Sequence, residues 1–335
     1  MRARAAVRAT PVAEAERSAR CSGAPALSEA PRSSLRSFAV SSPGTAEQQS
    51  PAYSLAPDLV REVFERAAFA RLLRRLLARA GGRRVLDLGC GDGLVAELAG
   101  ERLDAYVGID LYPPEGDGFV RHDLREGLGD VGAEPFDVYV GTFGVASHMA
   151  PDELRRLLSD IAAHARRGSL VALDALGLRS LEWPRVWDSP AGPRRTLTYR
   201  LADDVRVHPW SPCELAALFE EAGLEFRLAL DRSVQAGPKL GDEDYWPGLP
   251  RLREGLNGLL AGNPAGVEAL RAPLPRLPEH PASHVHRALA ATRASTLRTA
   301  ARRLRPAELA SAVWELEPLS ADGVGHGMLV VGRVA

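Results

Sequence analysis

Residues 85–93, VLDLGCGDG, decide the fold of this chain. The first four form a short predicted strand, and glycines follow at positions 89, 91 and 93. Glycine adopts backbone angles that are closed to other residues, and it lets a ligand lie against the main chain. Residues 94–99 then have a helical pattern, so the free N–H groups of that first turn face the same point. We therefore predict a strand, a tight glycine turn and a helix that together bind a ligand.

Short apolar segments alternate with helical segments on both sides of this turn. Strands that alternate with helices favour a parallel sheet with both faces covered. The predicted fold class is α/β, a doubly wound, mostly parallel seven-stranded sheet of Rossmann-like type with a helical insertion before the last strand. The predicted helices cover residues 56–80, 94–99, 151–167 and 211–223, and the strands cover 83–88, 105–109, 118–122, 136–140, 169–176, 225–230 and 327–334. Ser211, with Glu214 three residues later, predicts a capping box at the start of the last of these helices.

Composition divides the chain further. Residues 1–52 are rich in Ala, Ser, Arg and Pro without an apolar period, which predicts a disordered tail. A transit peptide is the alternative, and the glutamates of this segment count against it. We expect a ligand-binding core over residues 53–232, a helical insertion or lid over 233–320, and the final strand of the core within 321–335. Two or three helices are expected in the insertion. The clearest of them covers residues 282–304, and Pro306 is expected to stop it.

The bulk properties favour a soluble, cytoplasmic protein. The 335 residues carry a formal net charge of −1, so no overall field favours nucleic acid or an anionic membrane as partner. Three widely separated cysteines, Cys21, Cys90 and Cys213, match neither a disulfide framework nor a four-thiolate metal site. No apolar run approaches the roughly 20 residues that span a bilayer. The oligomeric state stays open.

The spacing of the glycines narrows the choice of ligand class. A dinucleotide fingerprint needs G-x-G-x-x-G, and its third glycine would fall at Leu94. A phosphate-binding P-loop would need a lysine after the glycines, and none follows. Asp87 instead precedes the loop, and an acidic mouth suits a cation better than a pyrophosphate.

The motif, and the acids at the later strand ends, resemble the class I S-adenosylmethionine (SAM)-dependent methyltransferases of small-molecule type. The resemblance covers roughly residues 57–335 and is most specific at the first motif. It implies SAM as cofactor, with the glycine loop under its methionine part and Asp87 close to its amino group. The loop residues concerned are Gly89, Cys90, Gly91 and Gly93.

The same resemblance implies contacts at three later strand ends. Asp110, with Leu111 beside it, would bind both ribose hydroxyls. Asp123 would meet the adenine amino group, with the Leu124 backbone beside the ring. The segment after the fourth strand would close the pocket with backbone carbonyls, from Gly141 and Thr142.

The acceptor side is less defined, because methyl transfer from SAM is an in-line displacement that mainly needs alignment and exclusion of water. A general base is required only where the nucleophile holds its proton tightly. His148 is the best candidate base, and His208 is a weaker one that suits a turn equally well. Asp174 and Trp183 are further candidates for the pocket lining. An aromatic wall, with a core role as the alternative for each member, would come from Trp187, Tyr199 and Trp210.

No metal is predicted. His280, His284 and His286 invite that interpretation, but a spacing of two places His284 and His286 on different sides of a helix.

Three functions stay open. The first is methyl transfer from SAM to an O, N or C nucleophile of a small-molecule acceptor. The second is a non-catalytic SAM- or nucleoside-binding module that acts as partner or regulator. Aminopropyl transfer is a third, against which the lack of extra acids around the donor counts. No N-P-P-[YF]-type motif follows the fourth strand, which weakens N-methylation of nucleic acids or proteins.

Overall fold

The computed structural model describes residues 58–192, 195–200, 204–237, 246–316 and 322–335, all within the compact unit Ser41–Ala335. The predicted tail, residues 1–52, lies outside the described residues, and so does Cys21. Within the described ranges, no helix has the length and apolar character that crossing a bilayer requires.

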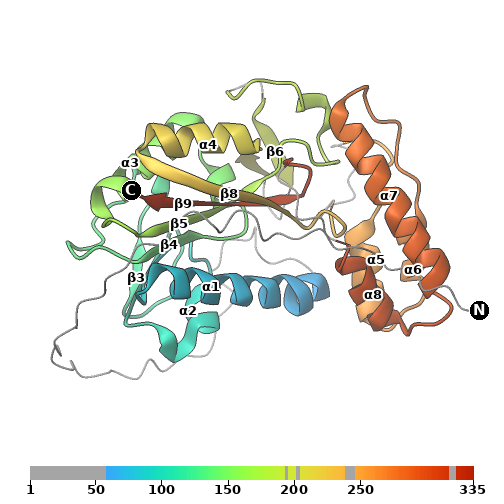
Figure 1. The fold of residues 1–335 in the computed structure, drawn as a ribbon, viewed down its shortest axis with the longest axis horizontal. Coiled ribbons are helices and arrows are strands. Elements are labelled where there is room, and N and C mark those ends of the chain that lie inside the picture. The colour runs from blue at the N-terminus through green and yellow to red at the C-terminus, as the bar shows by residue number, and fades with distance from the viewer. Residues whose placement is uncertain (1–57, 193–194, 201–203, 238–245, 317–321) are drawn as a thin grey trace, which may run out of the picture. The chain divides into compact units, whose positions relative to one another are not determined.

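A seven-stranded sheet forms the centre of the unit and confirms the predicted α/β fold class (Figure 1). The strand order is β3-β2-β1-β4-β5-β9-β8. The first five strands in this order run parallel, whereas β9 pairs antiparallel with both β5 and β8. The strands are β1 (Arg84–Leu88), β2 (Ala105–Asp110), β3 (Phe119–Arg121), β4 (Val138–Gly141), β5 (Leu170–Leu176), β8 (Leu224–Arg232) and β9 (Gly327–Val334).

Helices cover both faces of the sheet (Figure 1). A π-helical turn, η3 (Arg61–Glu65), leads into α1 (Arg66–Ala80), which lies with α2 (Leu94–Ala99) on one face. The other face carries α3 (Pro151–His164) and α4 (Pro212–Glu221). Neighbouring residues of β1 show the alternation, because Val85 packs in the cluster of α1 and Leu86 in the cluster of α3 and α4.

Local signals explain where these helices begin and end. Gly81 follows α1 with φ +69°, the left-handed conformation that ends many helices. The predicted capping box of α4 is confirmed: Ser211 Oγ accepts the Glu214 N–H at 3.3 Å, and Glu214 Oε2 accepts the Ser211 N–H at 2.9 Å. Pro151 occupies the first turn of α3, as expected.

Between β8 and β9 the described residues form α5 (Leu252–Leu260), α6 (Gly266–Arg271), α7 (Pro281–Ala300) and α8 (Pro306–Trp314). Two or three helices were expected here. The expected role of Pro306 was also incomplete: α7 ends at Ala300, and Pro306 begins α8, with the Glu308 carboxylate accepting the Arg305 N–H at 3.0 Å. A proline fits there because a first-turn N–H has no helical partner.

Several short elements were not predicted. A hairpin of β6 (Leu197–Arg200) and β7 (Asp204–Val207) precedes α4. Single helical turns occur at η4 (Gly100–Arg102), η5 (Leu124–Glu126), η6 (Val145–His148) and η7 (Pro184–Val186). Elements of three to five residues are too short for a hydrophobic period to identify them.

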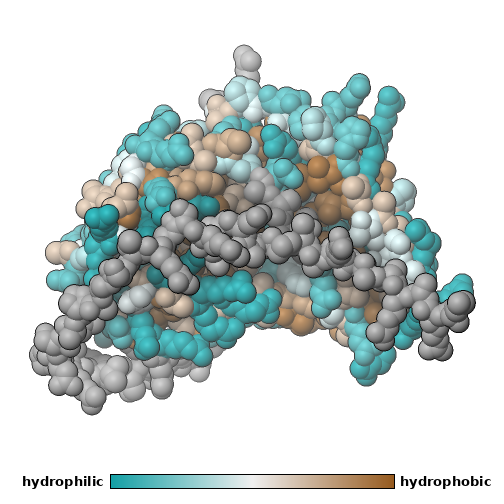
Figure 2. Space-filling view, viewed as in Figure 1, coloured by the Kyte–Doolittle hydropathy of each residue, from teal (hydrophilic) through white to brown (hydrophobic). Residues whose placement is uncertain are grey.

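Hydrophilic side chains spread over much of the face shown in Figure 2. Among the described residues, the exposed large apolar side chains are Val63, Leu111, Tyr112 and Leu304. Two of these four, Leu111 and Tyr112, directly follow β2 at the edge where the glycine loop lies.

Candidate cofactor and acceptor site

The glycine loop folds back over the end of the neighbouring strand. Both Gly89 N and Cys90 N donate to Ile109 O, at 2.8 and 2.9 Å. The three glycines have positive φ, +69° at Gly89, +53° at Gly91 and +81° at Gly93. These angles close the turn within a few residues, so α2 begins directly behind it.

The three glycines serve different purposes. A Cβ at Gly89 would stand 2.8 Å from Val145 Cγ2, and one at Gly93 would stand 3.2 Å from the Phe119 ring. At Gly91 no atom lies within 4 Å of that position. Val145 also fills the space beside Gly141. At Gly89 and Gly141 the lack of a side chain therefore makes room for Val145. Of the three loop glycines, Gly91 alone leaves open space beside the loop.

Asp110 ties the loop to the end of β2. Its Oδ2 accepts the Gly91 N–H at 2.9 Å, and its Oδ1 accepts the Tyr112 N–H at 2.9 Å. A carboxylate has about four acceptor positions, so both oxygens retain capacity for further donors. Leu111 and Tyr112 are exposed beside it, and the Arg121 guanidinium lies 5.6 Å from the centre of the Tyr112 ring.

Asp87 is completely buried beneath the loop. Tyr106 Oη donates to its Oδ2 at 2.8 Å, while its Oδ1 has no hydrogen-bond partner among the described residues. Burial raises the pKa of Asp87 to about 7, against the opposing hydrogen bond from Tyr106. Burial also raises the pKa of the Cys90 thiol well above its ordinary value, so Cys90 stays protonated. The role of Tyr106 was not predicted.

Asp123 lies just beyond β3 and caps η5. Its Oδ1 accepts the Arg125 N–H at 3.0 Å, and its Oδ2 pairs with Arg125 Nη2 at 2.6 Å. These hydrogen bonds and the charge of Arg125 lower the pKa of Asp123. Leu124 is buried. The described structure thus gives Asp123 a local partner that the sequence analysis had not assigned to it.

The segment after β4 has an unusual backbone. Thr142 is buried, and Phe143 and Gly144 follow with φ +49° and +86°. A positive φ is uncommon for phenylalanine and costs on the order of 1–3 kcal/mol, so the surroundings must enforce it. Gly144 N donates to Asp174 Oδ2 at 3.0 Å, and Asp174 pairs with Arg232. Asp174 was a candidate for the pocket wall, but it is a buried ion-pair partner that fixes this turn.

The two candidate bases lie close together. His148 is the last residue of η6, and the backbone N–H of His208 donates to the carbonyl oxygen of the preceding residue, Ser147, at 2.8 Å. Burial lowers the pKa of His148, and the nearby Asp110 charge opposes that shift. Its ring has no hydrogen bond among the described residues. Burial lowers the pKa of His208 as well, and Thr196 Oγ1 lies 3.3 Å from its Nδ1.

The three tryptophans proposed for the pocket lining and the aromatic wall are buried in the core. Each is buried, and each indole N–H donates to a backbone carbonyl: Trp183 to Gly177 O, Trp187 to Ser180 O and Trp210 to Ala146 O, at 2.9, 2.8 and 3.2 Å. Their polar atoms are therefore satisfied inside the protein. The side chain of Tyr199 lies outside the described residues.

Two histidines of the insertion, His280 and His286, make structural contacts. His280 Nδ1 accepts the Ala282 N–H at 3.0 Å and so caps α7. His286 Nε2 lies 2.7 Å from Arg179 O. Within the described part of the chain, no three His, Cys, Asp or Glu side chains are grouped to hold a metal ion.

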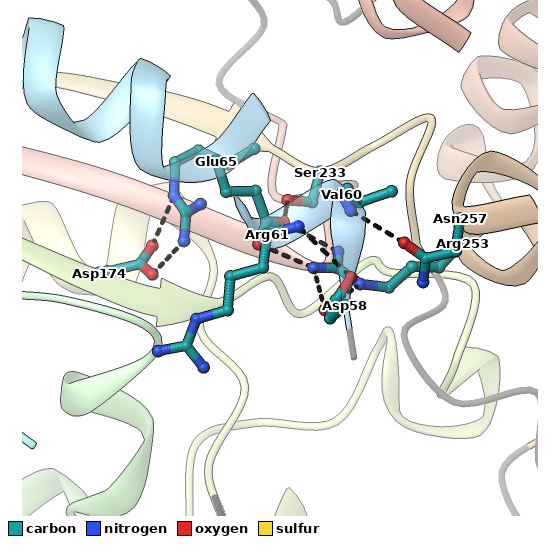
Figure 3. Close-up of polar contacts among 9 residues, drawn as sticks. Asp58, Val60, Arg61, Glu65, Asp174, Ser233, Arg253 and Asn257 are labelled. Carbon is teal, nitrogen blue, oxygen red and sulfur yellow. Dashed lines mark hydrogen bonds and ion pairs between the residues drawn. The ribbon is translucent and has the colours of Figure 1, made fainter. Parts of the chain in front are cut away.

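A buried ion-pair network, absent from the predictions, joins the insertion to the helix beside the site (Figure 3). Arg253 of α5 binds both oxygens of Glu65, at 2.9 and 2.8 Å, and also the Asp58 carboxylate at 2.6 Å. Ser233 Oγ donates to Glu65 Oε1 at 2.6 Å. The only sequence signal is a glutamate within an apolar helical stretch, which does not identify its partner.

A family model described as a methyltransferase domain matches residues 60–228, half of the chain. Among solved structures, an S-adenosylmethionine-dependent methyltransferase from Clostridium acetobutylicum ATCC 824 shares 11% identity with a TM-score of 0.41, over 52% of this chain and 87% of that one. The CcbJ methyltransferase from Streptomyces caelestis shares 17% identity with a TM-score of 0.39, over 52% and 88%. A SAM-dependent methyltransferase from Archaeoglobus fulgidus shares 17% identity with a TM-score of 0.38, over 82% and 98%. No curated protein matches the chain.

Proposed function

We propose that this chain transfers a methyl group to an O, N or C nucleophile of a small-molecule acceptor. The chain belongs to the methyltransferase family whose model it matches, and it is a SAM-dependent methyltransferase. The observation that carries the proposal is the junction of the glycine loop with the end of β2. Gly91 donates to Asp110 there, beside the completely buried Asp87.

Two features of this junction fit SAM. The Oδ1 atom of Asp87 is buried without a hydrogen-bond partner among the described residues, and a buried acceptor of this kind favours a cationic donor. The space beside Gly91 is open, which lets a ligand approach the loop backbone. We assign Asp87 to the ammonium group of SAM and Asp110 to its ribose hydroxyls, with Gly89, Cys90, Gly91 and Gly93 as the loop beneath.

The rest of the proposed cofactor site follows the strand ends. Leu111 and Leu124 flank the nucleoside, and Asp123 meets the adenine amino group once Arg125 shares its carboxylate. Gly141 and Thr142 lie at the end of β4, next to β1 in the sheet. This order supports a nucleoside across β2 and β3 and a methyl group toward the end of β4, on the side of η6 and His148.

When bound, SAM supplies a methyl group that is activated by the positive sulfur. The chain must then align the acceptor, exclude water and take up a proton where the acceptor has one to lose. We assign the last role to His148. Burial lowers the pKa of His148 below its ordinary 6.5, so its ring is neutral at pH 7 and can accept a proton. His208 is the alternative base on the same side.

A small acceptor is favoured by the insertion. Its helix α5 is anchored through Arg253 to Glu65 of η3, and the Arg61 guanidinium of the same turn lies 4.4 Å from the centre of the Phe143 ring, just beyond β4. We therefore place the insertion at the border of the proposed methyl position. Such a border limits the size of what enters and helps to exclude water.

The experiment is methyl transfer from label-carrying SAM to separate pools of small molecules, RNA and protein, together with calorimetry of SAM binding. We expect labelled product from the small-molecule pool. Binding of SAM without product in any pool would favour a non-catalytic module, and product in the RNA or protein pool alone would contradict a small acceptor.

The cofactor assignment is tested by Asp110→Ala. Loss of charged hydrogen bonds, at about 1.5–3 kcal/mol for such bonds, should weaken SAM binding about 10- to 100-fold. Asp130→Ala is the matched control, because Asp130 Oδ1 also accepts a backbone N–H two residues on, from Gly132 at 3.1 Å, but in an exposed turn. Unchanged affinity in a folded Asp110→Ala protein would refute the assignment.

A further inference from the structure

Arg61 is an arginine beside the proposed methyl position, and its head group has no ionic partner in the described part of the chain. It lies on the π-helical turn η3, and its guanidinium carbon is 4.4 Å from the centre of the Phe143 ring. In Figure 3 its side chain extends away from the ion-pair network. Among the described residues, no carboxylate pairs with this guanidinium.

The carboxylates nearby are bound by other arginines. Asp174 pairs with Arg232, and both Glu65 and Asp58 pair with Arg253. Arg61 contacts one of these acids through its backbone alone, because its N–H donates to Asp58 Oδ1 at 3.3 Å. The guanidinium of Arg61 therefore keeps its donors for something outside this network.

The turn that carries Arg61 is anchored on both sides. The preceding Val60 donates its N–H to Asn257 Oδ1 at 2.8 Å, and Glu65 binds Arg253, so α5 holds the turn at two points (Figure 3). The guanidinium carbon also lies over the Phe143 ring, which gives the head group a further contact. This fixation reduces the entropy that a long side chain loses on binding a ligand.

The support of Arg61 lies at the proposed reaction centre. Phe143 directly follows Gly141 and Thr142, which we assigned to the cofactor site, and its φ of +49° is enforced by the surroundings. Strained residues of this kind cluster at binding and catalytic sites. π-Helical turns are rare and are also frequent at functional sites.

We propose that Arg61 binds a carboxylate of the acceptor and that the acceptor is therefore an anionic small molecule. This inference rests on the proposed function. A guanidinium presents a planar fork that matches one carboxylate through two hydrogen bonds. A phosphate fits this position less well, because it carries close to two negative charges. The neighbouring cations, Arg232 and Arg253, are already paired with carboxylates and leave only Arg61 to bind it.

The test is a panel of aromatic and aliphatic hydroxy and amino acids, each matched with its primary amide, with methyl-labelled SAM and product detection by mass spectrometry. The panel is run with the unmodified protein, Arg61→Gln and Arg61→Lys. Arg185→Gln is the matched control, because the Arg185 guanidinium also lies over an aromatic ring, 5.6 Å from the centre of Trp246. Arg185 is exposed and distant in sequence from Arg61. Thermal unfolding checks that each variant is folded.

We expect kcat/KM to favour the acid over its amide by about 10- to 100-fold, as loss of a charged hydrogen-bonded pair predicts. Arg61→Gln should bring that ratio close to one through a higher KM for the acid, Arg61→Lys should restore part of it, and Arg185→Gln should leave it unchanged. Equal use of acids and amides, or a ratio unaffected by Arg61→Gln, overturns the inference while the proposed function stands. No product from any member, with SAM still bound, counts against both.

Discussion

Replacing Glu65 with Gln should strongly destabilise the fold, although it removes only a charge. Glu65 is 7% exposed, and Arg253 binds both of its oxygens from α5. Asp58 is the other carboxylate on Arg253, and its side chain is 15% exposed. The variant therefore leaves the buried Arg253 cation with one carboxylate, on the more solvent-exposed side of the pair.

The magnitude follows from burial. An exposed ion pair contributes about 0.2–1 kcal/mol, whereas removing one partner of a buried pair costs about 3–5 kcal/mol because the remaining charge stays desolvated. Gln retains one acceptor oxygen, and Asp58 retains part of the attraction. We therefore expect the free energy of unfolding to fall by about 3 kcal/mol.

Urea unfolding, followed by circular dichroism, measures this change. Glu62→Gln is the matched control, because Glu62 lies one turn earlier on the same helix and is exposed, 3.5 Å from Arg66. We expect the control to change stability by less than about 0.5 kcal/mol. The double variant Glu65→Met with Arg253→Met should be less destabilised than either single Met variant, because neither charge is left alone.

The free energy of unfolding at low pH should show the contribution of the same Glu65–Arg253 pair. Burial by itself raises the pKa of Glu65, but the hydrogen bonds and charge of Arg253 outweigh it and hold the pKa well below the ordinary 4.5. The stabilisation is therefore complete above about pH 4.5 and is lost as the pH falls below it. Glu65→Gln should lack this part of the acid sensitivity. A Glu65→Gln protein within about 0.5 kcal/mol of the unmodified one at pH 7 would refute the argument.

Two further predictions concern the site. His148→Ala should lower turnover and leave SAM binding, measured by calorimetry, unchanged. In the unmodified protein turnover should fall only below pH 6.5, because burial lowers the pKa of His148 and the neutral ring is the base. A loss of turnover that begins well above pH 6.5 would contradict this assignment. Gly89→Ala should cost about 2–4 kcal/mol of unfolding free energy, since its Cβ meets Val145 at a left-handed φ, whereas Gly91→Ala, with free space, should cost about 1–2 kcal/mol. Equal losses in urea unfolding would contradict the packing role of Val145.

Local chemistry explains what could be predicted at the site. Gly91 and Asp110 were predicted to lie at one site, because a glycine turn after a strand and an acid at the next strand end are short-range patterns. Parallel strands bring their carboxyl ends to one edge, and the two residues are hydrogen-bonded there. Val145, Tyr106 and Arg61 were missed. Each acts through a contact with a segment distant in sequence, and no periodicity records such a contact.

The sequence by itself determined the local elements and their alternation: the strand and glycine turn of residues 85–93, the Ser211 cap and the final apolar strand all follow from backbone angles, hydrogen bonds and hydrophobic spacing within a few residues. Only the tertiary structure decided that β9 runs antiparallel between β5 and β8, and that Glu65 finds Arg253. The physical reason is range. Strand pairing and buried charge pairing depend on which distant segments meet, and burial then sets the strength of each contact.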